Sequence, residues 1–328
     1  MTKSVRTSPT YKLTESDIKT ALAAVERESR EDPRLRKAQL SEAQARRRQG
    51  DKFLMAYLKK TGFDFAAHEK MRAQSQSALQ RLLKEQQAAA LKRSSAVKKH
   101  LLQGVESWRG TIERFRDGSL RSDFVPAFAV VDTPFIIWPS NNLELIDSHI
   151  QPWNNTAKVS AQWRDSGGNE NLRFIFVWEN PSDRWAIVNV ESALALNGTV
   201  DEFEEGGIFS GSVSNLSVDV RLNVWEWWNQ PPTSPFPQAT QSQHVLSLSA
   251  SGGGFLSSLG GGTVESASVQ GNFDVSRRLF LLPPNGVAVF EATLLFSYNN
   301  FDGGMIQVNF ASGDFQVMCP ALVIAILS

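Results

Sequence analysis

The sequence is poor in the residues that build disulfide and zinc sites. Cys319 is its single cysteine, and it has four histidines in 328 residues. One cysteine excludes a disulfide within the chain, and no set of familiar spacing for zinc exists. Cys319 lies in the apolar run 317–321 and is expected to be a small core residue. The sequence therefore predicts no metal and no cofactor.

Long apolar runs are also missing. No window reaches the roughly 18 apolar residues that span a bilayer. Residues 1–13 are polar and lack the apolar stretch of a secretory signal, so they are expected to form a polar arm. We expect synthesis in the cytoplasm without a signal peptide, and the sequence leaves the final location open.

Recognisable catalytic motifs are absent. No G-x-S-x-G motif occurs, and the consecutive residues Asp147, Ser148 and His149 would alternate between the two faces of a strand. The acidic run 201–205 lacks the pattern of a calcium loop and predicts a surface turn. We expect a protein that is not an enzyme. A carbohydrate hydrolase whose carboxylates are distant in sequence is an alternative.

The formal net charge of zero hides a strong asymmetry. Residues 1–122 hold 27 Lys and Arg against 14 Asp and Glu, and residues 123–328 hold 7 against 20, so the net charges are +13 and −13. The basic part could meet an anionic surface such as nucleic acid or a membrane. Alternatively, the two parts could meet between subunits. A third interpretation is that helices simply tolerate Lys and Arg while turns between strands collect Asp and Glu.

Proline is absent from residues 34–125, which favours long helices. Thr14 and Asp17 resemble a capping box for a helix that ends near residue 29. A second helical stretch is expected over about 35–60. Asp64 can cap a third that continues to residue 117. We therefore predict a basic helical domain over residues 14–122 that contains one long helix, 64–117.

The end of this long helix carries a narrow apolar stripe. Its members step by three or four residues: Val97, Leu101, Val105, Trp108, Ile112 and Phe115. A stripe with this spacing needs a second surface to cover it. It predicts a coiled coil or bundle that forms the interface of a homo-oligomer. Packing of the helices within one chain is the alternative.

The sequence changes character after residue 122. Apolar and polar residues alternate, as in 157–164, 218–224 and 290–297, and clusters of Gly, Asn, Asp and Ser separate these runs. Residues 123–328 therefore predict an acidic, all-β domain. The fold class is α+β with segregated parts, a long-helix bundle or coiled coil followed by an antiparallel, jelly-roll-like β-sandwich.

Two stretches of the β domain are candidates for binding. If 218–224 alternates regularly, five residues share the face opposite the core: Asp219, Arg221, Asn223, Trp225 and Trp227. Aromatic planes beside hydrogen-bonding groups suit a glycan or a protein anchor, whereas a bulge before Trp225 would return both indoles to the core. The glycine-rich loop 251–262 places Phe255, Leu256 and Leu259 at an apolar tip that could touch a membrane or a partner.

These observations favour a non-enzymatic, oligomeric assembly protein. Its helical stalk would present a β-sandwich head that binds a protein or a glycan. One alternative is a membrane-acting, pore-forming protein that inserts amphipathic helices or the loop 251–262. Another is a structural protein associated with nucleic acid through its basic helices.

Overall fold

The computed structural model describes residues 14–29, 52–117, 127–204, 213–227, 239–251, 262–301 and 303–327. The predicted arm 1–13 and the loop residues Phe255, Leu256 and Leu259 lie outside the described residues.

The helices begin where the sequence predicted their caps. Helix α1 spans Glu15–Ser29, and α3 spans Phe65–Arg116. At α1 the backbone N–H of Thr14 donates to Asp17 Oδ2 (2.9 Å) and the N–H of Asp17 donates to Thr14 Oγ1 (3.3 Å), which completes the capping box. Asp64 Oδ1 accepts from the N–H of Ala67 at 2.9 Å and caps α3. Residues 52–60 are helical as well.

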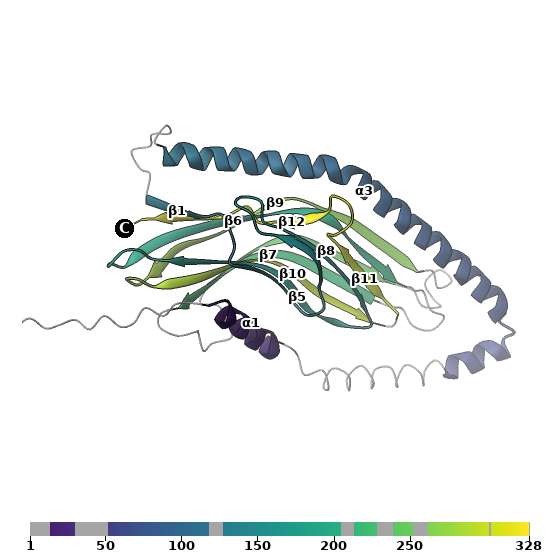
Figure 1. Ribbon diagram of the computed structural model, residues 1–328. Coiled ribbons are helices and arrows are strands. Elements are labelled where there is room, and N and C mark those ends of the chain that lie inside the picture. Colours follow the sequence, from purple (N-terminus) through teal and green to yellow (C-terminus); the bar gives the residue numbers. More distant parts are fainter. Residues whose placement is uncertain are drawn as a thin grey trace, which may run out of the picture.

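The β part consists of thirteen described strands. They are β1 (Ala127–Val131), β2 (Ile136–Pro139), β3 (Glu144–His149), β4 (Thr156–Arg164), β5 (Gly167–Glu179), β6 (Ala186–Glu204), β7 (Val213–Trp227), β8 (Ala239–Ser251), β9 (Thr263–Leu282), β10 (Val287–Phe301), β11 (Met305–Asn309), β12 (Gln316–Met318) and β13 (Leu322–Ile326). They form two antiparallel sheets that face each other (Figure 1). The helix followed by a β-sandwich is thus present, and the jelly-roll detail stays a prediction.

Sheet A, the eight-stranded sheet, is organised around the long strand β6. One edge of β6 pairs with β9 along its length, from Ala186 to Glu204. The other edge pairs in succession with β13, β12 and β11. Strand β4 then pairs with β11 and β12 on one side and with β3 on the other. Sheet B has five strands in the order β2-β5-β10-β7-β8.

The main core lies between the two sheets. Sheet B contributes alternate residues such as Phe174, Leu222 and Phe290, and sheet A contributes others such as Leu196 and Val308. All of these side chains are fully buried, which is the pattern expected of strands with one apolar face. Cys319 is buried in the same core, as predicted, and burial raises the pKa of its thiol to about 12.

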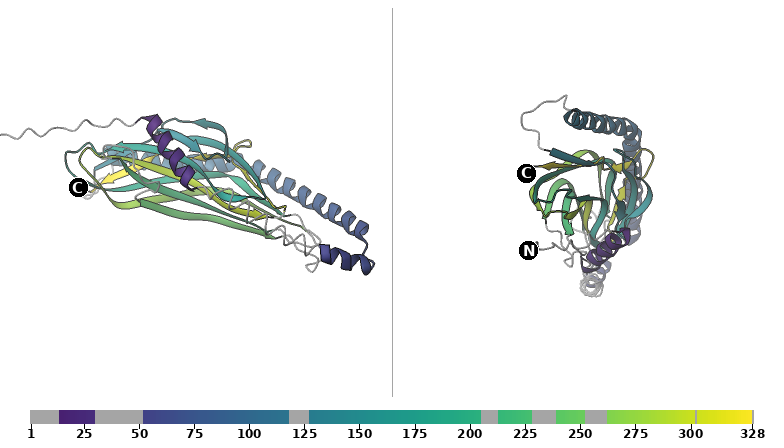
Figure 2. Two further views of the ribbon diagram at one scale, coloured as in Figure 1. Left: turned by 90° about the horizontal axis from the view of Figure 1, so that it is seen from below. Right: turned by 60° about the vertical axis from the view of Figure 1, so that its left-hand side comes forward.

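Helix α3 lies across the outer face of sheet A, and α1 lies on the opposite side of the sandwich (Figures 1 and 2). Two polar contacts join α3 to β6. Gln87 Nε2 donates to Asp201 Oδ2 at 2.9 Å, and Asn197 Nδ2 donates to the carbonyl oxygen of Ser94 at 3.0 Å. Gln87 and Ser94 are seven residues apart, so the same face of the helix meets the strand at both contacts.

The apolar stripe of α3 packs within the chain. Leu101 and Val105 are buried against Ala195 and Met318, with Val97 beside them. Farther along, Ile112 is buried with Trp153 and Ala321, and Trp108 packs against this group, whereas Phe115 remains 37% exposed. The second surface that the stripe requires is therefore the chain's own sheet A. Self-association through these six residues stays a prediction, but the need to cover the apolar stripe no longer supports it.

Residues 201–204, the described part of the acidic run 201–205, do not form the surface turn that the sequence suggested. Strand β6 continues through it to Glu204, and Asp201, Glu202 and Glu204 are all buried. Asp201 faces α3, where burial raises the pKa of its carboxyl against the opposing effect of hydrogen bonds from Ser266 and Gln87. Strand alternation places Glu202 on the opposite face, within the sandwich.

Candidate functional site

The predicted binding residues of β7 share the outer face of sheet B, the face turned away from sheet A. The pairing of β7 with β10 runs without a register shift from Val213 to Trp227. No bulge therefore precedes Trp225, and the indole lies on the same face as Asp219, Arg221 and Asn223. The backbone of Trp227 continues β7, but its side chain lies outside the described part of the structure.

Trp225 is not exposed, because α1 covers it. Ile18 of α1 is 2% exposed and packs with Trp225, which is 5% exposed, and with Ile175 and Val289 of the neighbouring strands. Figure 2 shows α1 lying across this sheet. The predicted aromatic platform is thus the part of the face that α1 occupies, and the polar residues Asp219, Arg221 and Asn223 make up the rest.

We expect Ile18→Asp to weaken the contact between α1 and sheet B, because a carboxylate would be placed on a buried apolar surface. Trp225 should then become accessible to acrylamide. The measurement is fluorescence quenching of the variant with and without Trp225→Phe, which isolates this indole. Thr20→Asp changes an exposed position of the same helix and should leave quenching unchanged. Equal quenching of both variants would contradict the covering role of Ile18.

A hydrogen-bonded group surrounds Asp219 on the open part of the face. Asp219 Oδ1 lies 2.9 Å from His244 Nδ1 on the neighbouring strand β8, and Asp219 Oδ2 lies 4.0 Å from a terminal nitrogen of Arg221. Ser217 Oγ donates to Asp219 Oδ2 at 3.4 Å. The carboxylate therefore holds the histidine by a hydrogen bond and lies beside the charge of the arginine on one surface.

The histidine also meets a serine. Ser247 Oγ lies 3.2 Å from His244 Nε2. One tautomer satisfies both contacts of the ring: Nδ1–H donates to Asp219 and Nε2 accepts from the Ser247 hydroxyl. Serine, histidine and aspartate are thus linked in a row through the two ring nitrogens.

A β-bulge in β8 brings this row together. Val218 pairs with Leu246 and Asp219 with His244, so Val245 is the extra residue. Val245 and Leu246 both pack toward the core although they are consecutive. His244 and Ser247, three residues apart, consequently share the outer face, which a regular strand would forbid.

A second polar group lies beside the first. Asn223 Nδ2 donates to Glu291 Oε2 of β10 at 3.2 Å, and Asn223 Oδ1 accepts from Thr240 Oγ1 of β8 at 3.1 Å. Glu291 is buried and Thr240 is exposed. The amide is therefore held between an inner acceptor and an outer hydroxyl.

The β7 residues were predicted from the sequence, whereas their partners on the neighbouring strands were not. His244, Ser247 and Glu291 come from strands whose pairing with β7 a single sequence does not reveal. One local signal was present. The adjacent apolar residues Val245 and Leu246 break the alternation of β8, and such a break is typical of a bulge.

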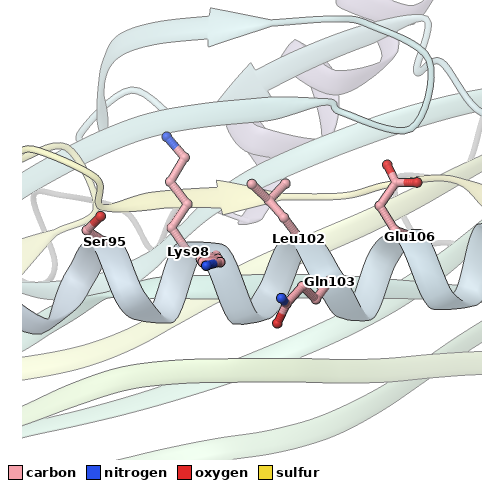
Figure 3. Close-up of a pocket in the computed structure, with 6 residues that line it drawn as sticks. Ser95, Lys98, Leu102, Gln103 and Glu106 are labelled. Atoms are coloured by element: carbon pink, nitrogen blue, oxygen red, sulfur yellow. The ribbon is translucent and has the colours of Figure 1, made fainter.

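A shallow depression follows the flank of α3 (Figure 3). Its lining comes from this single helix: Ser95, Lys98, Lys99, Leu102, Gln103 and Glu106. Lys98 Nζ is 3.3 Å from Asp314 Oδ1, and Leu102 packs partly against the buried stripe. Because no second element converges on it, the depression lacks the arrangement of a ligand site.

Two features are absent from the described residues. No three His, Cys, Asp or Glu side chains among them are grouped so that they could hold a metal ion. No helix in the described ranges has both the length and the apolar character needed to cross a membrane.

Comparison with protein-family models finds no match, and comparison with curated proteins finds none either. Among solved structures, the module TmCBM61 in complex with β-1,4-galactotriose aligns with a TM-score of 0.21 and 10% identity over 56% of this chain and 86% of its own. TmCBM27, a mannan-recognising carbohydrate-binding module, aligns with a TM-score of 0.21 and 10% identity over 62% and 97%. The C-terminal family 22 carbohydrate-binding module of Clostridium thermocellum Xyn10B gives 0.18 and 8% over 63% and 98%. Alignments at these scores carry no argument about this chain.

Proposed function

We propose that this protein is a binding protein whose β-sandwich recognises a glycan on the outer face of sheet B. The observation that carries the proposal is the polar surface around Asp219, Arg221 and Asn223, which combines a carboxylate, a guanidinium, an amide and hydroxyl groups. Hydrogen bonds order its carboxylate and its amide. Such preordered donors and acceptors suit a ligand that presents many hydroxyl groups, because each can donate and accept.

The charge of this surface favours a neutral ligand. Asp219 and Arg221, whose charged groups lie 4.0 Å apart, offset each other. A surface built for phosphate or nucleic acid would instead gather several Lys or Arg residues without acidic partners. Two basic clusters, Lys92-Arg93 and Lys98-Lys99, lie on α3, on the other side of the sandwich.

The apolar part of the face is compatible with the same proposal. Trp138 of β2 packs partly buried near Ile18, and Trp225 lies beneath α1. An aromatic plane beside hydrogen-bonding groups is the usual composition of a sugar site. In this structure α1 occupies the aromatic part, so the first contacts of a glycan would be made by the polar part.

We expect the full-length protein to bind neutral oligosaccharides on a glycan array. Arg221→Ala should weaken binding at least about tenfold, because an ordered charged donor is worth roughly 1.5–3 kcal/mol. Binding should change little between 0.05 and 0.5 M NaCl, since a neutral ligand releases no counterions.

Arg278→Ala removes an exposed arginine from β9 in sheet A and serves as the matched control. It should leave glycan binding unchanged. Binding restricted to anionic glycans and abolished by salt would contradict the proposal, as would equal affinities of the Arg221 and Arg278 variants.

Self-association is a second part of the proposed function. It is supported by the opposite net charges of residues 1–122 and 123–328, which favour contact between the helices of one copy and the sandwich of another. The dependence of stability on protein concentration tests it.

A further inference from the structure

We propose that Ser247, His244 and Asp219 form a hydrolytic triad that removes ester-linked acyl groups from a glycan bound to sheet B. The choice of a glycan ester rests on the proposed function, whereas the triad itself rests on geometry. Ser247 Oγ to His244 Nε2 is 3.2 Å, and His244 Nδ1 to Asp219 Oδ1 is 2.9 Å. These distances are those of a nucleophile, its general base and the group that orients the base.

The assignment of roles follows from which atoms are exposed. Asp219 is the least accessible of the three, with 18% of its side chain exposed, and Ser217 and Arg221 hold it in place. His244 and Ser247 are exposed, so Ser247 Oγ can reach a substrate above the sheet. Ser247 is then the nucleophile and His244 the general base. Asp219 is a positioning residue that fixes the ring tautomer.

The register of the strands places a further donor next to the nucleophile. Ser217 pairs with Ser247, and the next pair on the same face is Asn215 with Ser249. Asn215 Oδ1 accepts from Ser249 Oγ at 2.9 Å, which turns its amide nitrogen away from that contact. Along the ladder, the Ser217–Ser247 pair therefore lies between the Asp219–His244 pair and the Asn215–Ser249 pair.

This order matches what acyl transfer requires. A carbonyl carbon above Ser247 would direct its oxygen toward the side of Asn215, where an amide N–H can stabilise the developing negative charge. The leaving oxygen would face His244. Asn215 is thus the residue that we assign to the oxyanion.

The proposed reaction conserves atoms and protons. Ser247 Oγ attacks the ester carbonyl while His244 Nε2 takes the hydroxyl proton. The bond between the carbonyl carbon and the sugar oxygen breaks, and His244 returns the proton to that oxygen, which leaves as the glycan hydroxyl. His244 then takes a proton from water, and the water oxygen attacks the acyl carbon. The bond between that carbon and Ser247 Oγ breaks, His244 returns the proton to Oγ, and a carboxylic acid leaves. The balance is ester plus water to acid plus alcohol, and no oxidant or metal takes part.

The shape of the surface limits the acyl group. The triad lies on the exposed face of a two-strand ladder, and the groups around it are polar: Ser217, Arg221 and Asn215. A short acyl group such as acetyl fits this surface better than a long chain, which would need apolar walls.

The test uses the full-length protein with p-nitrophenyl acetate and with a fluorophosphonate probe. We expect hydrolysis above the buffer rate, and we expect peptide mass spectrometry to find the probe on Ser247. Ser247→Ala should reduce hydrolysis to the buffer rate, and His244→Gln should lower it at least about 100-fold. Asp219→Asn should lower kcat with little change in KM, since Asp219 acts through the histidine.

Ser242→Ala is the matched control, because Ser242 is an exposed serine of the same strand that does not contact His244. It should hydrolyse the ester like the unaltered protein. Hydrolysis by the unaltered protein that equals that of Ser247→Ala would overturn the triad, provided that both unfold at the same temperature. Hydrolysis without glycan binding would overturn the proposed function and leave the triad in place. Glycan binding without hydrolysis would overturn the triad and leave the proposed function in place.

Discussion

Leu101→Ala should lower the free energy of unfolding by about 3 kcal/mol, because removing a buried leucine side chain costs the transfer free energy and leaves a cavity. Leu101 is 3% exposed and packs between α3 and sheet A, against Ala195 and Met318. Since the contact lies within one chain, α3 and the sandwich should unfold together. Urea denaturation followed both by helical circular dichroism and by tryptophan fluorescence measures the change.

Leu82→Ala provides the control on the same helix. Leu82 is 45% exposed, so its truncation should change stability by less than about 0.5 kcal/mol. The experiment also tests self-association through the stripe. If Leu101 packs only within the chain, the denaturation midpoints of the unaltered protein and of Leu101→Ala will depend on protein concentration in the same way between about 1 and 100 μM. A midpoint that rises with concentration and loses this dependence in the variant would place Leu101 between subunits.

Glu202→Gln should stabilise the protein at pH 8 by about 2 kcal/mol and have little effect near pH 4.5. Burial within the sandwich raises the pKa of Glu202 from 4.5 to about 7, and Glu265 and Glu204 add to the rise. The Ala250 amide and the Ser214 hydroxyl oppose it. A carboxyl group buried here would ionise without the hydration that stabilises a carboxylate in water. A glutamine remains neutral at every pH.

The direction in which stability changes with pH follows from the number of protons bound by the folded and unfolded states. Between pH 4.5 and about 7 the folded protein holds a proton on Glu202 that the unfolded chain has lost. Stability therefore falls as pH rises through this window, and the loss is complete above it, with an upper limit of about 3 kcal/mol at 1.36 kcal/mol per pKa unit. Urea denaturation at pH 4.5, 6 and 8 measures it. Glu191→Gln, at an exposed position of the same strand, should show no such trend.

The sequence predicted local structure well where the signal was local. Thr14, Asp17 and Asp64 are helix caps whose partners lie three residues away, and all of them form as expected. The alternation of 218–224 likewise placed Arg221 and Asn223 on the outer face and their neighbours in the core. Each of these patterns depends on a few consecutive residues.

The failures concern contacts between distant segments. The stripe of α3 correctly indicated a second surface, but which surface covers it depends on β6, far along the chain. Trp225 lies on the predicted face, yet Ile18, more than half the chain away, buries it. The acidic run 201–205 was predicted to be a surface turn because its own residues do not show that β6 continues to Glu204.

In the candidate site too, local patterns were predicted and contacts between distant strands were not. Asp219 was found from the periodicity of its own strand. Its link to His244 and Ser247 requires the β7–β8 register and a bulge at Val245, and neither follows from composition. A triad assembled from a ladder of two strands is therefore invisible to motif searches, which read residues at fixed spacing.

The placement of α3 on β6 has a consequence for synthesis. The helix ends at Arg116, whereas β6, which contributes Ala195 to the cover of the apolar stripe, begins at Ala186. At roughly 5–20 residues per second, a ribosome needs on the order of 10 s to extend the nascent chain from one to the other. Throughout that interval β6 has not been synthesised, so it cannot cover Leu101 and Val105. During translation, binding by chaperones or association of nascent chains on a polysome would therefore compete with the docking of α3 on sheet A.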